Sequence, residues 1–168
     1  MSTKLRVGVV LALLTVASVT VATATSFGDD DDDSSRSGAL RLVAKEVAFT
    51  DVDLGDNGFS QGDQVAFTND LLSNGTKVGE DGGVCTAVRL TDVSATFQCN
   101  GTNALPGGQI AVQGLVTYGP GDEELKQDPY SFAITGGTGK YRAARGEVVI
   151  QDVASDEFHL TFRIHGTG

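Results

Sequence analysis

The chain has 168 residues, of which 22 are acidic and 12 are basic, so that its formal net charge is −10. This length suits one domain with a sizeable core. The excess of negative charge argues against nucleic acid and anionic membrane surfaces as partners, because both would repel it.

The first two dozen residues have the pattern of a secretory signal peptide. Lys4 and Arg6 supply positive charge, residues 7–21 are mostly apolar, and Ala22-Thr23-Ala24 resembles a cleavage site. We therefore expect residues 1–24 to be removed and the mature protein to be secreted, without stable membrane insertion. An uncleaved anchor is the alternative.

Residues 25–38 contain five consecutive aspartates, Asp29–Asp33. Like charges in a run repel one another, and Phe27 is the only large apolar residue nearby. The segment is predicted to be a disordered acidic linker. The folded domain is then expected to occupy residues 39–168.

From Ala39 onward, apolar and polar residues alternate with a period of two, which is typical of β-strands with one buried face. Strands of this length without helical crossovers favour an all-β fold, an eight-stranded antiparallel β-barrel, with a two-sheet sandwich as the alternative. The eight predicted strands are Leu40–Asp51, Gln64–Asn69, Val84–Leu90, Val93–Cys99, Gln109–Tyr118, Tyr130–Thr135, Gly146–Val153 and Phe158–His165.

Two short motifs define turns in this pattern. Asn74-Gly75 and Asn100-Gly101 have residue types that tight reversals prefer. The stretch around Asp92 is predicted to fold back as a hairpin, which places Cys85 directly opposite Cys99. In an exported protein this pair is expected to form a disulfide, the alternative being a free Cys85 that lines a pocket.

The glycine-rich stretch FAITGGTGKYRAARGEV superficially resembles a phosphate-binding loop. A P-loop requires Ser or Thr after Gly-Lys, whereas Gly139-Lys140 is followed by Tyr141, so nucleotide binding is not supported. No metal-ligand spacing or hydrolase triad stands out either. His159 and His165 are expected on the polar face of the last strand, and no metal or cofactor is predicted.

Three blocks resemble the allene oxide cyclase barrel superfamily, which also contains the dirigent proteins. They are GDQVAFTNDLLSNGTKVGEDGGVCTAV, GGQIAVQGLVTY and GGTGKYRAARG. The resemblance implies an eight-stranded barrel that binds a hydrophobic small molecule in its lumen and, in the enzymes, directs its cyclisation or isomerisation without a cofactor. It also implies a homotrimer. The glycine-rich stretch then becomes a strand, a turn and the next strand.

The resemblance also implies site residues. Val65, Phe67 and Asn69 match the lumen-facing Val-x-Phe-x-Asn of the cyclases, Cys85 matches their pocket cysteine, and Tyr118 falls near a family tyrosine. We expect these residues to contact substrate, with Asn69 in a catalytic role.

Two further catalytic candidates have other parallels. Arg145 matches the arginine of the dirigent ARG block, and Asp51 offers a carboxylate on the first strand, whereas Phe49 stands where the cyclases have a glutamate. Phe97 is a candidate for substrate contact or for packing. Three hypotheses remain: an enzyme of this kind, a non-catalytic carrier of lipophiles, and a structural barrel with a filled interior.

Overall fold

The computed structural model describes residues 39–55, 58–119 and 128–166. The predicted signal peptide and acidic linker lie outside these residues, as does part of the connection after Tyr118. No helix in the described part of the chain is long and apolar enough to cross a bilayer.

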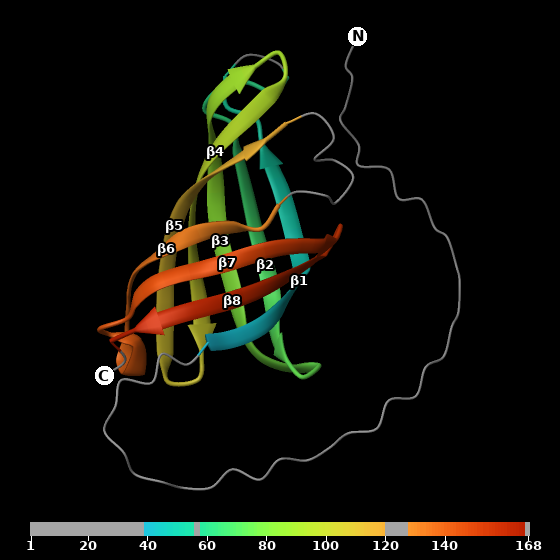
Figure 1. The fold of residues 1–168 in the computed structure, drawn as a ribbon. Coiled ribbons are helices and arrows are strands. Elements are labelled where there is room, and N and C mark those ends of the chain that lie inside the picture. Colours follow the sequence, from blue (N-terminus) through green and yellow to red (C-terminus); the bar gives the residue numbers. More distant parts are fainter. Residues whose placement is uncertain (1–38, 56–57, 120–127, 167–168) are drawn as a thin grey trace, which may run out of the picture. The chain divides into compact units, whose positions relative to one another are not determined.

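The described residues form a closed barrel in which each strand pairs with its neighbours in the sequence and β8 pairs with β1, all antiparallel (Figure 1). The predicted fold is therefore confirmed, and the sandwich alternative is wrong. The strands are β1 (Ala39–Val52), β2 (Gln64–Ser73), β3 (Thr76–Thr91), β4 (Ser94–Leu105), β5 (Gly108–Tyr118), β6 (Tyr130–Gly137), β7 (Arg145–Ala154) and β8 (Glu157–His165).

Several strands extend further than the alternation predicted. β3 begins at Thr76, eight residues before the predicted start at Val84. The prediction missed its first half, TKVGEDGG, because the glycines and charges of this segment are typical of loops. Asn100-Gly101 was predicted as a turn, and this is wrong, since both residues lie inside β4, where Gly101 pairs with Gly83 on one side and Val112 on the other. Asn74-Gly75 does form the β2–β3 turn, with positive φ at both residues.

The end of the barrel that is lower in Figure 1 carries the β2–β3 and β4–β5 turns and the short helix η2 (Gly139–Tyr141). This lower end is tightly packed. Tyr141 is buried in the hydrophobic core together with inward-facing residues of the surrounding strands, such as Leu42, Ile110 and Ile164. A barrel of eight strands is narrow enough for side chains to fill its interior, and this end shows that arrangement.

The glycine-rich stretch closes the lower end. It forms the end of β6, η2 and the start of β7, as the resemblance implied. Gly139 has φ of 57°, and a Cβ there would lie 2.1 Å from the Gly107 carbonyl oxygen. Only glycine allows this approach, so the stretch is a structural corner that holds η2 against the β4–β5 turn.

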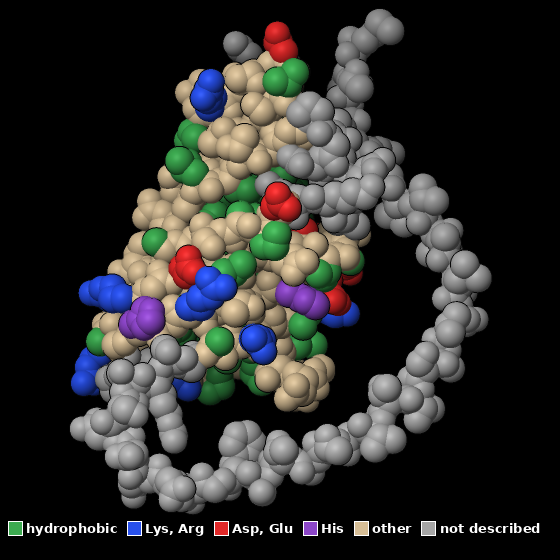
Figure 2. All heavy atoms as spheres, in the orientation of Figure 1, with side chains coloured by type: hydrophobic (Ala, Val, Ile, Leu, Met, Phe, Trp, Pro, Cys, Tyr) green, Lys and Arg blue, Asp and Glu red, His purple; other side chains and the backbone are tan. Residues whose placement is uncertain are grey.

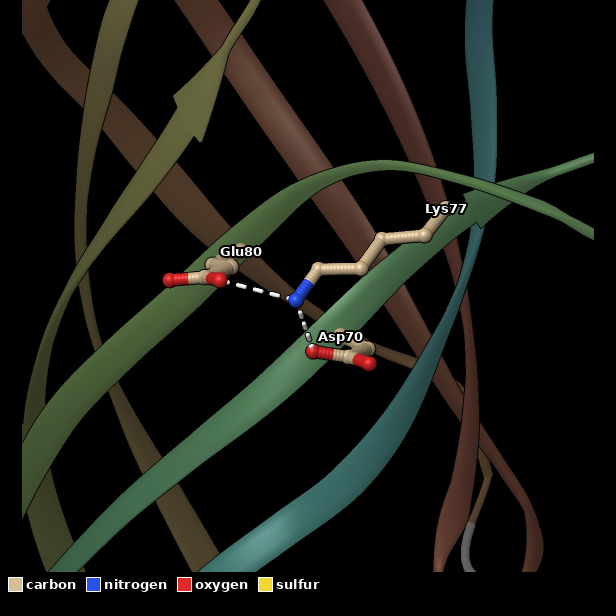
Figure 3. A network of polar contacts seen from close by, with 3 residues as sticks. All are labelled: Asp70, Lys77 and Glu80. Carbon is tan, nitrogen blue, oxygen red and sulfur yellow. Dashed lines mark hydrogen bonds and ion pairs between the residues drawn. The ribbon is translucent and has the colours of Figure 1, made fainter.

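An exposed ion network lies on the outer face near the β2–β3 turn (Figure 3). Asp70 and Glu80 are directly opposite each other on β2 and β3, and the Lys77 ammonium lies 2.7 Å from Asp70 and 2.8 Å from Glu80. The hydrogen bond with Asp70, followed by that with Glu80, raises the pKa of Lys77. The lysine thus offsets the repulsion of two like charges paired across strands.

Candidate functional site

The upper end of the barrel, which carries the β1–β2 loop and the β3–β4 hairpin, is built differently. β1 pairs with β8 only as far as Lys45, and β5 pairs with β6 only over residues 110–113. Above these points β1 to β5 continue to pair with one another, and the β3–β4 hairpin extends beyond β6 to β8 (Figure 1). The inner face of this five-stranded upper region is called the mouth.

Most of the residues implied by the resemblance lie in the mouth. The register aligns inward-facing positions of three neighbouring strands in two adjacent rows. One row is Asp51, Val65 and Cys85, and the other is Phe49, Phe67 and Gly83. Phe49 is 53% exposed although it faces inward, whereas inward-facing residues at the lower end are buried. The mouth is therefore open to solvent at its rim, where Asp51 also lies exposed.

The disulfide forms part of the mouth wall. Cys85 on β3 lies opposite Cys99 on β4, with the two Cα atoms 4.0 Å apart and the sulfurs bonded. The predicted disulfide is confirmed, and the alternative of a free Cys85 is wrong because no described cysteine is free. A bonded Cys85 offers the lumen an apolar sulfur surface and no thiolate nucleophile.

Aromatic rings line the mouth on the side of β4 and β5. Phe97 on β4 stacks on Phe59 of the β1–β2 loop, with ring centroids 5.8 Å apart, and meets Tyr118 of β5 edge-on at 5.9 Å. Tyr130 and Phe132 of β6, which is not part of the mouth, form a second pair with ring centroids 5.5 Å apart, and Phe132 belongs to the buried core. Such rings provide large flat apolar surfaces with a polarisable face.

The β1–β2 loop that carries Phe59 is held by a buried aspartate. Asp63 accepts hydrogen bonds from the Leu54 amide at 2.8 Å and the Ser60 amide at 2.7 Å. These two bonds lower the pKa of Asp63, the bond from Leu54 contributing most. The side chain is fully used in fixing the loop, so its role is to position Phe59.

A polar layer lies below the aromatic rings, inside the lumen. Asn69 on β2 is buried, and its amide nitrogen donates a 2.7 Å hydrogen bond to the carboxyl of Asp81 on β3. Burial raises the pKa of Asp81 to about 6 despite this hydrogen bond, which acts in the opposite direction. Asp81 is thus a lumen carboxyl that changes its charge near neutral pH.

Glu46 of β1 lies opposite Asn69, on the other side of it from Asp81. Burial, and secondarily the nearby Asp156, raise its pKa as well. Glu46 continues the inward-facing series of Leu42 and Ala44, but the β-bulge between Glu46 and Ala48 means that alternation counted back from Phe49 and Asp51 assigns it to the outer face.

A second carboxyl faces inward from β7. Asp152 lies opposite Phe158 of β8, and one of its oxygens, Oδ1, is buried without a hydrogen-bond partner. Tyr130 forms a hydrogen bond with this carboxyl, and burial is the main reason that the pKa values of both groups are raised. Tyr118 also interacts with Tyr130. Buried polar atoms are normally satisfied, so an orphaned carboxylate oxygen suggests a missing partner.

Sequence reasoning missed both lumen aspartates, although a signal for each was present. Counting back from Cys85 in steps of two gives Gly83 and Asp81, but this segment was interpreted as a loop. Within the predicted strand Gly146–Val153, the same alternation places Val148, Ile150 and Asp152 on one face.

Arg145 is not brought together with the other candidates. It begins β7 opposite His165, its side chain is exposed, and its guanidinium donates a 2.7 Å hydrogen bond to the Ala144 carbonyl oxygen. Its neighbour Gly146 faces inward opposite Ile164, so Arg145 faces outward near the lower end. Of the catalytic candidates, Asn69 lies inside the lumen and Asp51 at the exposed rim of the mouth.

A separate hollow of about 350 Å³ lies on the outside of the barrel, over β3 to β6. Outward-facing residues such as Val84, Thr102 and Gln113 surround it, and glycines form its floor. It contains no titratable side chain, so it offers shape and apolar contact without acid–base chemistry. Among the described residues, no group of three or more His, Cys, Asp and Glu is arranged to hold a metal ion.

The allene oxide cyclase barrel like domain matches residues 43–164, and no curated protein sequence matches the chain. The structure of a pyocyanin demethylase is similar, with 29% identity and a TM-score of 0.63 over 74% of this chain and 100% of the other. Two others share the fold at 18% identity. One is the Diels Alderase AbmU from Streptomyces koyangensis, with a TM-score of 0.59 over 75% of this chain and 64% of the other. The second is the pterocarpan synthase dirigent protein GePTS1, with a TM-score of 0.54 over 78% of this chain and 86% of the other.

Proposed function

Because the chain belongs to the allene oxide cyclase barrel like family, we propose that it binds a hydrophobic small molecule in the mouth and directs its cyclisation or isomerisation. The observation that carries the proposal is the position of Asp81, a half-buried lumen carboxyl on the inner face that also carries the aromatic rings of the mouth. Relatives named as a demethylase, a Diels Alderase and a pterocarpan synthase agree with chemistry on small organic molecules.

In this proposal the chain supplies positioning and one proton. The rings of Phe97 and Tyr118 hold the substrate in a conformation that brings its reacting atoms together. Asp81, with a pKa of about 6, donates a proton or a hydrogen bond to an oxygen that becomes negative and takes the proton back afterwards. Asn69 fixes the orientation of the Asp81 carboxyl through their hydrogen bond.

Binding is tested with Nile red, a neutral dye whose fluorescence rises in apolar surroundings. We expect the purified protein to bind it, Phe97→Ala to weaken binding at least tenfold, and Leu115→Ala to leave it unchanged. Leu115 is the matched control, because it is 59% exposed on the outer face of β5. Equal losses in both variants, or no binding at all, would contradict a site in the mouth.

Catalysis is tested on the molecule that native mass spectrometry finds bound to protein from its own producing cells. Cyclisation and isomerisation leave mass unchanged, so chromatography of the released molecule before and after incubation reports turnover. We expect the wild type to convert it and Asp81→Asn to bind without converting it. Equal conversion by both proteins would leave Asp81 without a catalytic role, and binding without conversion by the wild type would favour a carrier.

We also propose secretion and self-association, which the signal-like N-terminus and the family resemblance suggest. The disulfide suits an oxidising compartment. The outer face of β3 to β5 exposes Val84 and Leu115 beside the uncharged hollow, which suits contact with further copies of the chain. Light scattering of wild type and Leu115→Glu tests the trimer: a trimer that this charge dissociates supports it, and a monomeric wild type contradicts it.

A further inference from the structure

All the described basic side chains lie on the outside of the barrel. None of them faces the lumen, and every one is exposed; several are visible over β7 and β8 in Figure 2. They are Arg41, Lys45, Lys77, Arg89, Lys140, Arg142, Arg145, His159, Arg163 and His165. The interior therefore offers no positive charge from the described residues.

Among the described residues, the charged side chains inside the lumen are all acidic, and Asp51 lies exposed at the rim above them. Glu46, Asp81 and Asp152 face inward from β1, β3 and β7, and none of them is paired with a Lys, Arg or His side chain. Asp81 accepts a hydrogen bond from the neutral amide of Asn69, and Asp152 accepts one from the neutral hydroxyl of Tyr130. The Oδ1 atom of Asp152 has no hydrogen-bond partner. Placing carboxyls in an apolar interior without counter-charges costs free energy that packing does not require.

The aromatic side chains beside Asp152 would also favour a cation, since Tyr130 forms a hydrogen bond with Asp152 and Tyr118 interacts with Tyr130. The faces of Phe97, Tyr118 and Tyr130 are negative in their quadrupole, so a flat positive group is attracted by them as well as by the carboxylates. An anionic lipid would be repelled by the same carboxylates. Its carboxylate would enter a lumen that already holds three acids and whose described residues provide no guanidinium or ammonium to receive it.

We propose that the ligand of the mouth is a flat aromatic cation, or an aromatic base that binds in its protonated form, and not a carboxylate-bearing lipid. The inference rests on the proposed function, since it requires a ligand in the mouth. Asp152 and Asp81 supply the counter-charges, and the rings of Phe97 and Tyr118 contact the apolar faces. The unpartnered Oδ1 of Asp152 is the acceptor for the positive end of the ligand.

The test uses three ligands of similar shape and different charge: 10-methylacridinium, anthracene and anthracene-9-carboxylate. Each is titrated into the full protein at pH 7.5 and its binding is followed by fluorescence. We expect the cation to bind at least tenfold more tightly than the anion, with anthracene between them. Tightest binding by the anion or by anthracene would overturn the inference and leave the proposed function standing. Absence of binding by all three in a protein that binds Nile red would overturn the inference alone, and absence of Nile red binding as well would overturn the proposed function.

General attraction to an acidic protein is separated from a specific site by matched charge removals. Asp152→Asn and Asp81→Asn are each expected to weaken 10-methylacridinium binding at least fivefold and to leave anthracene within twofold. Asp92→Asn is the control, because it removes the same charge from the exposed tip of the β3–β4 hairpin, and it should change cation affinity less than twofold. Equal effects of the three substitutions would overturn the proposal, and thermal unfolding of each variant confirms that it is folded.

Discussion

Apolar and polar residues alternate along the strands at both ends of this barrel, but inward-facing residues differ in their exposure to solvent between the two ends. At the lower end, inward-facing Ile110 and Phe162 are fully buried, and η2 covers them. At the upper end, inward-facing Phe49 is 53% exposed. The difference arises because β1 loses its β8 partner after Lys45 and β5 loses its β6 partner after Gln113. An inward position is therefore a core position only where the wall is complete.

The largest expected contrast is between two phenylalanines that both face inward. Phe162→Ala should lower the free energy of unfolding by about 3–5 kcal/mol, because it removes a fully buried ring. Phe49→Ala should cost about 1 kcal/mol or less, since much of that ring already contacts water. Urea unfolding at constant pH measures both. Similar losses would mean that the upper end is packed as tightly as the lower end.

Removing the disulfide should have the next largest effect on stability. The bond closes a loop with a sequence separation of 14 residues, so the double variant Cys85→Ser, Cys99→Ser should be destabilised by about 3 kcal/mol. Its wall position predicts that Nile red affinity also falls. The control is the wild type unfolded with and without reductant, which should reproduce the loss in the double variant. A change below about 1 kcal/mol would contradict a structural role for the bond.

The lumen carboxyl makes stability depend on pH in a defined direction. The folded protein holds the Asp81 proton more tightly than the unfolded chain, since burial raises its pKa from 3.8 to about 6. Stability should therefore fall as pH rises through this window. Asp81→Asn should remove most of the fall and add about 1–3 kcal/mol above pH 6, with no gain near pH 3.5.

Urea unfolding of wild type and Asp81→Asn between pH 3.5 and 7.5 checks this. Part of the slope should remain in the variant, because the raised pKa values of Asp152 and Glu46 act in the same direction. Asp63, whose pKa is lowered, acts in the opposite direction below its ordinary range. A variant less stable than wild type at pH 7 would show that ionised Asp81 stabilises the fold.

The smallest effect is expected at Arg145. Its side chain is exposed and its hydrogen bond goes to the adjacent Ala144 carbonyl. Arg145→Ala should change the free energy of unfolding by less than about 0.5 kcal/mol and leave Nile red affinity within twofold. A tenfold loss of affinity would place this arginine in the binding site and would require a different assignment of the mouth.

The fold could be predicted from the sequence because alternation in segments such as Phe158–His165 specifies strands with one buried face. The opposed cysteines could also be paired, since the hairpin about Asp92 fixes their register. The candidate site was only partly accessible. Val65, Phe67, Cys85 and Tyr118 came from resemblance to the family, whereas Phe97 was a candidate for substrate contact or for packing; all five share one inner face with Asn69.

The acids of the lumen were not identified by the family resemblance, although alternation places Asp81 and Asp152 on inward-facing positions. Glu46 precedes a bulge, so alternation counted back from Phe49 and Asp51 assigns it to the outer face. Asp81 stands in a glycine-rich run that resembles a loop, because β3 there packs closely against its neighbours: a Cβ on Gly83 would lie 2.8 Å from Phe67 Cζ. The mouth is open because β1 pairs with β8 and β5 pairs with β6 over only part of their lengths. The lengths of these pairings depend on how the whole barrel closes and cannot be read from one strand.

The most direct test is a crystal structure of the protein from crystals soaked with 10-methylacridinium, because it distinguishes a ligand in the mouth from one in the hollow on the outside of the barrel. We predict the ring system against Phe97 and Tyr118 in the mouth, with its charged nitrogen facing the Asp152 carboxyl. Electron density over the uncharged outer hollow around Val84 and Gln113, with an unoccupied mouth, would contradict the assignment of the lumen acids and aromatic rings as the ligand site.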